Sequence, residues 1–290
     1  MADGEARYRD AIAAVRPDLA AAPLTIHAHS WDSDAVEAAG TIFKFPKHAE
    51  AAARLRREAR LLVLIRPLVP LAVPDMRLHE TPQLFSEHAA IPGSTIVTPQ
   101  YEALEDPQRD AMAAALAGLY AALHAIPVEA AVAVGVEPKP EWPAADVVLP
   151  ILADRLPGAI HDFARKAFAA YAALPPEDEV LGYFDGHGWN MAFDHERGVL
   201  NGVYDFADAG IGPRSREFTY SNLIAGDLTA RIIGGYERPT GRLIDRRTVA
   251  VRTAVQFLAE LAEPNAEIED FRAGAIRWHD YMQARPELRI

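Results

Sequence analysis

Three side chains with oxygen donors fall close together in the stretch Gly182–Gly210, GYFDGHGWNMAFDHERGVLNGVYDFADAG. Asp185 and Asn190 are five residues apart in a loop before an apolar β-type run, and Asp205 ends the next β-type run. A hairpin formed by the two runs would bring the three side chains to one end of a two-stranded ribbon. Carboxylate and amide oxygens suit Mg²⁺, which binds through one or two protein carboxylates together with substrate phosphates. A carboxylate that does not bind the metal can deprotonate an attacking hydroxyl.

The order and spacing match the phosphoryl-transfer template, in which D-x-x-x-x-N is followed by D-F-G. Either half alone is a common chance match, but both in the right order around a hairpin are not. The chain resembles the aminoglycoside phosphotransferase family of kinase-like enzymes. In that family the corresponding stretch reads H-G-D-x-x-x-x-N and is followed by a hairpin and the sequence I-D-F. The resemblance implies that Asp185 is the catalytic base, that Asn190 holds one Mg²⁺ and that Asp205 chelates both metal ions. Tyr183 and Phe184 replace the family's His-Gly, so we expect this loop to be supported differently.

The same family has a lysine on a small-lobe strand and a glutamate on the next helix. Lys44 lies in the β-type run TIFKFP, and Glu58 lies in REARLL on the following helix. Each residue alone would be an ordinary surface charge. The FKFPK and REARLL runs resemble the 2″-aminoglycoside phosphotransferase branch, which implies that Lys44 contacts the α- and β-phosphates of a nucleotide and that Glu58 holds it in place. Lys47 competes for this role, but it follows Pro46 and is expected to lie outside the strand.

Two further segments resemble nucleotide-binding parts of the family. The SWDSD run, with Ser30 and Ser33, occupies the place of the loop that covers the nucleotide, although an ordinary Asx turn explains the same residues equally well. The run LFSEHAAIPG resembles the hinge, where backbone groups pair with a purine, and there we assign Glu87 and Ala89. Because backbone contacts do not separate ATP from GTP, either nucleotide is an expected donor.

Acidic and aromatic residues suited to a cationic acceptor gather after about residue 225. Carboxylates pair with ammonium groups, and aromatic rings cover sugar faces or cations. A solvated helix face is the simpler explanation for any one of these residues, and Arg272 and Arg277 lie among them. The candidates for acceptor contacts are Glu260, Glu263, Asp270 and Trp278.

The elements that must position these side chains change character along the chain. Before residue 92 the strand-like runs are 24–28, 41–45, 71–78 and 84–91, and the helices are 5–16 and about 48–65. This pattern predicts an antiparallel sheet with one prominent helix. Beyond about residue 103 the pattern is mainly helical. The expected helices are 110–125, 144–155, 158–173, 214–228, 244–262 and 266–284, with a proline-rich loop at 128–142.

These elements predict an α+β fold, and the resemblance implies a bilobal, protein-kinase-like one. A nucleotide-binding lobe is expected over 1–91, with a hinge at about 85–98. A helical C-terminal lobe over 92–290 would carry the catalytic loop and the acceptor pocket. His124 and Glu217 fall at positions that the family also fills, and we interpret both as structural.

Composition excludes several classes of protein. The 290 residues are 50% hydrophobic and 24% charged, and they include no cysteine, so disulfides and thiolate metal sites are excluded. The net charge is −12, and 29 acids against 18 bases after residue 98 give that part −11. A protein that binds nucleic acid by neutralising phosphates would be basic, so the expected partners are a nucleotide and a small-molecule substrate. Acidity alone indicates only solubility, but in the lobe beyond the hinge it favours an amine-rich acceptor.

The location of the protein is predicted from its apolar segments. The polar N-terminal residues contain no apolar run typical of a signal peptide, and prolines and an arginine interrupt the apolar stretch 61–73. We therefore expect a cytoplasmic protein that does not insert into a membrane and is a monomer or a dimer.

Three functional hypotheses remain. The first is a small-molecule kinase that transfers the γ-phosphate of ATP or GTP, with Mg²⁺, to a hydroxyl of an aminoglycoside-like, amine-rich acceptor; antibiotic resistance is an expectation carried by the resemblance alone. Within this hypothesis the acceptor could instead be a macrolide, choline, homoserine or a similar alcohol. The second is a nucleotide-binding pseudokinase, which the presence of all four core groups disfavours. The third is a metal-dependent hydrolase that uses Asp185, His187 and Asp205, although their spacing is no zinc motif.

Overall fold

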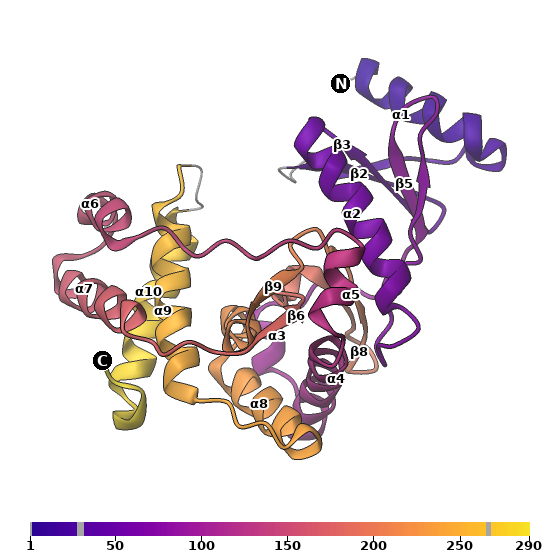
Figure 1. Cartoon of the computed structure of the whole chain (residues 1–290). Coiled ribbons are helices and arrows are strands. Elements are labelled where there is room, and N and C mark those ends of the chain that lie inside the picture. The colour runs from indigo at the N-terminus through magenta and orange to yellow at the C-terminus, as the bar shows by residue number, and fades with distance from the viewer. Residues whose placement is uncertain (1, 28–31, 265–267) are drawn as a thin grey trace.

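The computed structural model describes residues 2–27, 32–264 and 268–290, and its N-terminal part is built on an antiparallel sheet (Figure 1). The strands are β1 (Thr25–His27), β2 (Ser33–Ala38), β3 (Thr41–Pro46), β4 (Arg77–His79) and β5 (Phe85–Ala89), in the order β1-β2-β3-β5-β4. The predicted runs at 24–28, 41–45 and 84–91 correspond to β1, β3 and β5. Most of the run 71–78 is irregular, and β2 was not predicted because its residues SDAVEA are mainly small or charged.

Two helices flank this sheet, α1 (Ala2–Val15) and α2 (Ala49–Ile65). Tyr8 and Ile12 of α1 pack with Phe43 and other strand residues in a small separate core. On α2 the buried face includes Leu55, Glu58, Leu62 and Ile65, which recur at helical spacing. The apolar members of this face join the main core below the sheet. Burial of that face therefore carries the one carboxylate in it, Glu58, into the interior.

Helices dominate the chain after the sheet. They are α3 (Thr98–Glu102), α4 (Asp106–His124), α5 (Val128–Ala133), α6 (Ala145–Arg155), α7 (Gly158–Ala172), α8 (Gly226–Thr240), α9 (Arg246–Ala262) and α10 (Ile268–Gln283). Helices α6, α7, α9 and α10 share a core of their own, and Figure 1 shows them grouped to one side of α4 and α8. The expected α+β class, with a sheet first and helices after it, is confirmed. No helix of the described residues is long and apolar enough to cross a membrane.

Two expectations about the helical part were wrong. The proline-rich segment 128–142 contains the short helix α5. The segment 214–228 forms two 3₁₀ turns, η3 (Arg214–Phe218) and η4 (Tyr220–Leu223), before α8 begins. The Thr219 and Ser221 hydroxyls donate to the carbonyls of Arg216 and Phe218, and such side-chain bonds to the backbone compete with an α-helix.

Two short two-stranded ribbons lie within the helical part of the chain, between α7 and α8. The predicted hairpin is present as β7 (Met191–Asp194) and β8 (Val199–Val203), with Met191 opposite Val203. The backbone N–H of Tyr204 donates to the Asn190 carbonyl at 3.0 Å, which extends the pairing past the strand ends. The second ribbon joins β6 (Glu179–Gly182) to β9 (Gly210–Pro213). The segments just before β7 and just after β8 therefore lie side by side.

Candidate active site

The loop between β6 and β7 holds Asp185 by both carboxylate oxygens. The Asn190 side-chain amide donates to Asp185 Oδ2 at 2.6 Å, and His187 Nε2 lies 3.1 Å from Oδ1. Burial lowers the pKa of His187, but the hydrogen bond and the charge of Asp185 outweigh burial and raise that pKa above its ordinary value. The carboxylate of Asp185 is thus oriented before any substrate arrives, with a proton-binding group beside it.

Glu217, interpreted from the sequence as structural, supports this loop from below. Its buried carboxylate accepts the backbone N–H groups of Tyr183 at 2.8 Å and Phe184 at 3.0 Å. His124 lies 3.4 Å from the same carboxylate and bonds the Tyr236 hydroxyl at 3.0 Å. Phe184 has a φ of 52°, a left-handed conformation that costs a non-glycine residue about 1–2 kcal/mol. The two hydrogen bonds to Glu217 hold the backbone in that conformation.

Tyr183, which replaces the family's histidine, supports this loop. Its hydroxyl donates to the carbonyl of Tyr204, the residue before Asp205. Its ring packs on Phe206 with centroids 4.5 Å apart. Burial raises the pKa of Tyr183 well above its ordinary value, so the hydroxyl keeps its proton and remains a donor. Tyr183 therefore connects the loop that carries Asp185 to the segment that carries Asp205.

Lys44 lies between two carboxylates from distant parts of the chain. Its Nζ is 3.3 Å from Glu58 Oε1 and 3.1 Å from Asp205 Oδ1. Glu58 Oε1 also accepts the backbone N–H of Phe206 at 2.9 Å. Burial opposes the charged form of Lys44, but the carboxylates of Asp205 and Glu58 prevail and raise its pKa. The three side chains thus join the sheet, α2 and the segment after β8 in one charged group.

The donor set at Asn190 and Asp205 fits Mg²⁺. The Asn190 amide donates its N–H groups to Asp185, and its Oδ1 accepts no hydrogen bond from the described residues. The Asp205 side chain is 39% exposed, so its carboxylate is accessible beside Lys44. Hard oxygen donors of this kind are the ligands that Mg²⁺ takes along with phosphates. Within the described ranges no cluster of three His, Asp or Glu side chains could hold a metal ion alone.

Two serines and a second lysine were also considered for contacts with the nucleotide. Ser30 lies outside the described residues, and Ser33 begins β2 opposite Pro46. Lys47 lies past the strand end, as expected, with Nζ 3.2 Å from Asp34 Oδ1. Lys44 is therefore the lysine that faces Asp205.

The sheet register revises the prediction for the hinge residue Glu87. Glu87 lies in β5 between Phe43 of β3 and Arg77 of β4, and its carboxylate is 3.1 Å from His79 Nε2. Its backbone therefore faces another strand on either side, which leaves no edge for a purine. Ala89 pairs with Thr41 of β3 but lies beyond the end of β4, so its position stays compatible with a purine contact.

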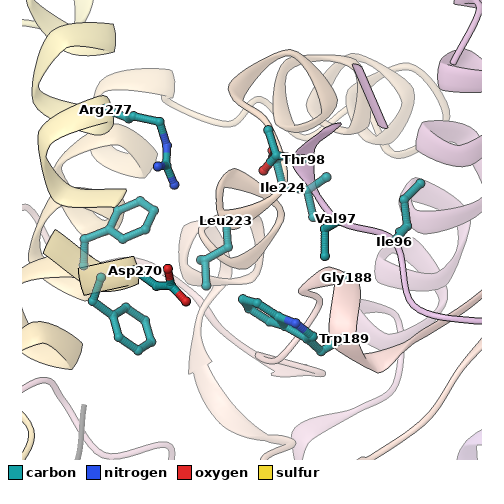
Figure 2. Close-up of a pocket in the computed structure, with 11 residues that line it drawn as sticks. Ile96, Val97, Thr98, Gly188, Trp189, Leu223, Ile224, Asp270 and Arg277 are labelled. Atoms are coloured by element: carbon teal, nitrogen blue, oxygen red, sulfur yellow. Dashed lines mark hydrogen bonds between the residues drawn. The ribbon is translucent and has the colours of Figure 1, made fainter. Parts of the chain in front are cut away.

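An apolar cavity lies beside the loop that carries Asp185 (Figure 2). Its volume is about 160 Å³, and Gly188 and Trp189 of the loop form part of its wall. Asp270, predicted for the acceptor, lines this cavity together with Arg277. The remaining lining residues carry little signal in the sequence, since they come from four separate segments. Trp189, 53% exposed and next to Asn190, is the one residue that its position in the motif could have indicated.

The other predicted acceptor residues are placed differently. Trp278 is buried in the helical core, where its indole N–H donates to the Ala250 carbonyl at 3.1 Å; the prediction for this residue is therefore revised to a structural role. Glu263 follows the last residue of α9 and is exposed. Glu260, in the last turn of α9, accepts from Gln256 at 2.9 Å and has its other carboxylate oxygen buried without a partner. Burial raises the pKa of Glu260 to about 7, against the opposing effects of Gln256 and the nearby His187.

Comparison with known proteins finds similar folds among solved phosphotransferase structures. The structure of the GDP and kanamycin complex of APH(2″)-IIIa is similar with a TM-score of 0.76 and 21% identity, covering 97% of this chain and 99% of that chain. The macrolide 2′-phosphotransferase MphH from Brachybacterium faecium gives 0.64 and 21%, covering 87% and 91%. The streptomycin–ATP–APH(2″)-IIa ternary complex gives 0.63 and 17%, covering 93% and 95%. No curated protein matches the sequence significantly. The model of the phosphotransferase enzyme family (APH) matches residues 24–258, and the chain belongs to that family.

Proposed function

We propose that the protein transfers the γ-phosphate of ATP or GTP, with Mg²⁺, to a hydroxyl of a small molecule. The observation that carries this proposal is the meeting of Lys44, Glu58 and Asp205 within 3.3 Å, beside a loop that presents Asp185. Solved structures of similar fold contain GDP in one case and ATP in another. Both nucleotides therefore belong in the test.

The residues have separate tasks in this reaction. Lys44 would bind phosphate oxygens, held for that task by Glu58, and Asn190 and Asp205 would hold the metal. When bound, Mg²⁺ neutralises charge on the phosphates. Asp185 would orient the acceptor hydroxyl and take its proton as the new O–P bond forms and the bond to the β-phosphate oxygen breaks. His187, beside Asp185, is placed to hold that carboxylate in position.

We place the division of labour at the predicted boundary, with the nucleotide bound mainly by residues 1–91 and the acceptor by 92–290. In support, Lys44 and Glu58 fall in the first part and the cavity residues in the second. A kinase of this kind would work where ATP and GTP are abundant, in the cytoplasm.

Two acceptor classes each have an observation in their favour. The net charge of −11 after residue 98 favours an amine-rich, aminoglycoside-like acceptor, as in the kanamycin complex of a similar fold. The apolar cavity beside Trp189 favours a macrolide-like alcohol, the kind of substrate named for another similar structure. A role in antibiotic resistance would follow only if the acceptor in the cell is itself an antibiotic of one of these classes.

The test combines binding and turnover. The melting temperature should rise with ATP or GTP plus Mg²⁺, and nucleotide turnover should require an acceptor. Asp185→Asn should abolish turnover and keep the nucleotide-dependent rise in melting temperature. Wild-type turnover by this variant would remove Asp185 from the role of base. A protein that binds nucleotide but never transfers phosphate would be a pseudokinase.

A further inference from the structure

The cavity beside the catalytic loop has walls that are mainly apolar. Its side chains include Ile96, Val97, Trp189, Leu223 and Phe271 (Figure 2). Contact with such walls stabilises a ligand by removing apolar surface from water, at about 25 cal/mol per Å². Ammonium groups would instead lose hydration there without gaining a partner.

The wall formed by the loop is held in a fixed place. The Ile96 N–H donates to the Gly188 carbonyl at 3.1 Å, and a Cβ on Gly188 would lie 1.7 Å from the Ile96 carbonyl oxygen. The Tyr204 hydroxyl donates to the Trp189 carbonyl at 2.8 Å. The exposed Trp189 ring is therefore presented from a rigid backbone, two residues from His187 and next to Asn190.

Two opposite charges from α10 face this cavity. Asp270 and Arg277 are seven residues apart, which places them on one face of the helix, roughly 10 Å apart along its axis. Both line the cavity, and neither forms an ion pair or hydrogen bond with another described residue. By contrast, the neighbouring Arg272 is occupied, because it donates to the Arg155 carbonyl and to Glu269.

The local charge balance differs from that of the whole lobe. The acidic lobe exerts a long-range field that attracts cations, but the cavity itself presents one carboxylate against one guanidinium. Neither Glu260 nor Glu263 lines it. Asp270 can pair with one ammonium group, whereas further ammonium groups would meet Arg277 and apolar walls.

On the basis of the proposed kinase function, we infer that the acceptor is an alcohol with a broad apolar face and a single ammonium group, and that Arg277 selects against polycations. Asp270 binds the ammonium, and Trp189 covers the apolar face. This inference narrows the two acceptor classes to the apolar one.

The experiment compares kcat/KM for erythromycin, a macrolide with one amino group, and kanamycin, which has several, with MgATP and with MgGTP. The wild-type protein should prefer erythromycin at least about 10-fold. Arg277→Glu should raise kcat/KM for kanamycin relative to erythromycin about 10-fold or more. The matched control is Arg165→Glu, the same charge change at an exposed position on α7 away from the cavity.

Binding is measured separately through tryptophan fluorescence. Erythromycin should quench the emission of the wild-type protein, and Trp189→Phe should lose that response. Asp270→Asn should raise the KM for erythromycin several-fold at little cost in kcat.

A preference for kanamycin, an unchanged ratio in Arg277→Glu, or an equal change in Arg165→Glu would each overturn the inference. So would a protein that binds nucleotide but phosphorylates neither compound. If no nucleotide raises the melting temperature, the kinase function itself fails, which is a distinguishable result.

Discussion

Two regions next to the loop that carries Asp185 treat charge in opposite ways, and we propose that one is the donor side and the other the acceptor side. On the donor side, Lys44 is within 3.3 Å of two carboxylates, so the charges are paired, and the Lys44 and Glu58 side chains are largely buried. On the acceptor side, Asp270 and Arg277 line an apolar cavity without partners among the described residues.

The difference fits what we propose each side binds. The donor phosphates and Mg²⁺ would be the same in every turnover, so a preorganised charged group would lower the cost of binding them. The acceptor defines the specificity of the enzyme, and unpaired charges on an apolar wall discriminate between ligands by what they fail to match. Four substitutions test this contrast, from the largest expected effect to the smallest.

Lys44→Met should break the donor side. Removal of the cation takes away a phosphate contact and leaves Glu58 and Asp205 as neighbouring like charges, so kcat/KM for the nucleotide should fall about 10²–10³-fold. The matched control is Lys47→Met, because the Lys47 ammonium pairs with Asp34 and not with Glu58 or Asp205. Equal losses in the two variants would contradict the assignment of Lys44.

Glu217→Ala should destabilise the loop shared by the two sides. It leaves the buried N–H groups of Tyr183 and Phe184 without an acceptor, which should cost about 2–4 kcal/mol of unfolding free energy. Glu217→Gln keeps one carbonyl acceptor and should lose less. Urea unfolding measures both, and identical losses would show that these hydrogen bonds are not the cause.

Glu260→Gln should remove a pH dependence of the protein's stability that arises near His187. The folded-state pKa of about 7 lies above the ordinary value of 4.5, so the folded protein holds a proton that the unfolded chain releases. Stability from this group is present below about pH 4.5 and is lost as the pH rises through 7. The variant should therefore gain stability over the wild type between pH 5 and 8, by at most about 3 kcal/mol and by less because the residue is partly exposed.

Melting temperatures of both proteins across that range provide the measurement. A constant difference at every pH would show that Glu260 does not titrate there.

Tyr183→Phe should have the smallest effect. It changes the contact between the loop that carries Asp185 and the segment that carries Asp205. Loss of the hydroxyl bond to the Tyr204 carbonyl should lower kcat about 10-fold with any acceptor, since one hydrogen bond is worth about 1 kcal/mol. Tyr204→Phe is the contrasting variant. It removes the bond to the Trp189 carbonyl and should raise the acceptor KM instead. If Tyr183→Phe instead raised the acceptor KM and Tyr204→Phe instead lowered kcat, the roles assigned to the two tyrosines would be wrong.

Local contacts in the chain were predictable from the sequence. Asp185, Asn190 and Asp205 fall within one loop and one hairpin, and alternation of apolar residues and turn residues encodes such a hairpin directly. The segment 214–228, predicted as one helix, shows the limit of this approach. Its apolar spacing favours an α-helix, but the hydroxyls of Thr219 and Ser221 bond to nearby carbonyls, and two 3₁₀ turns form before α8.

The sequence by itself determined the family, the α+β class, and the residue types available for phosphate, metal and proton. The tertiary structure alone decided which charges meet: Lys44 and Asp205 are 161 residues apart, and no periodicity connects them. It also decided that Trp278 is buried while Asp270 and Arg277 face the cavity. The reason is physical, because a cavity wall is formed by side chains from separate segments, and its chemistry exists only once packing has brought those segments together.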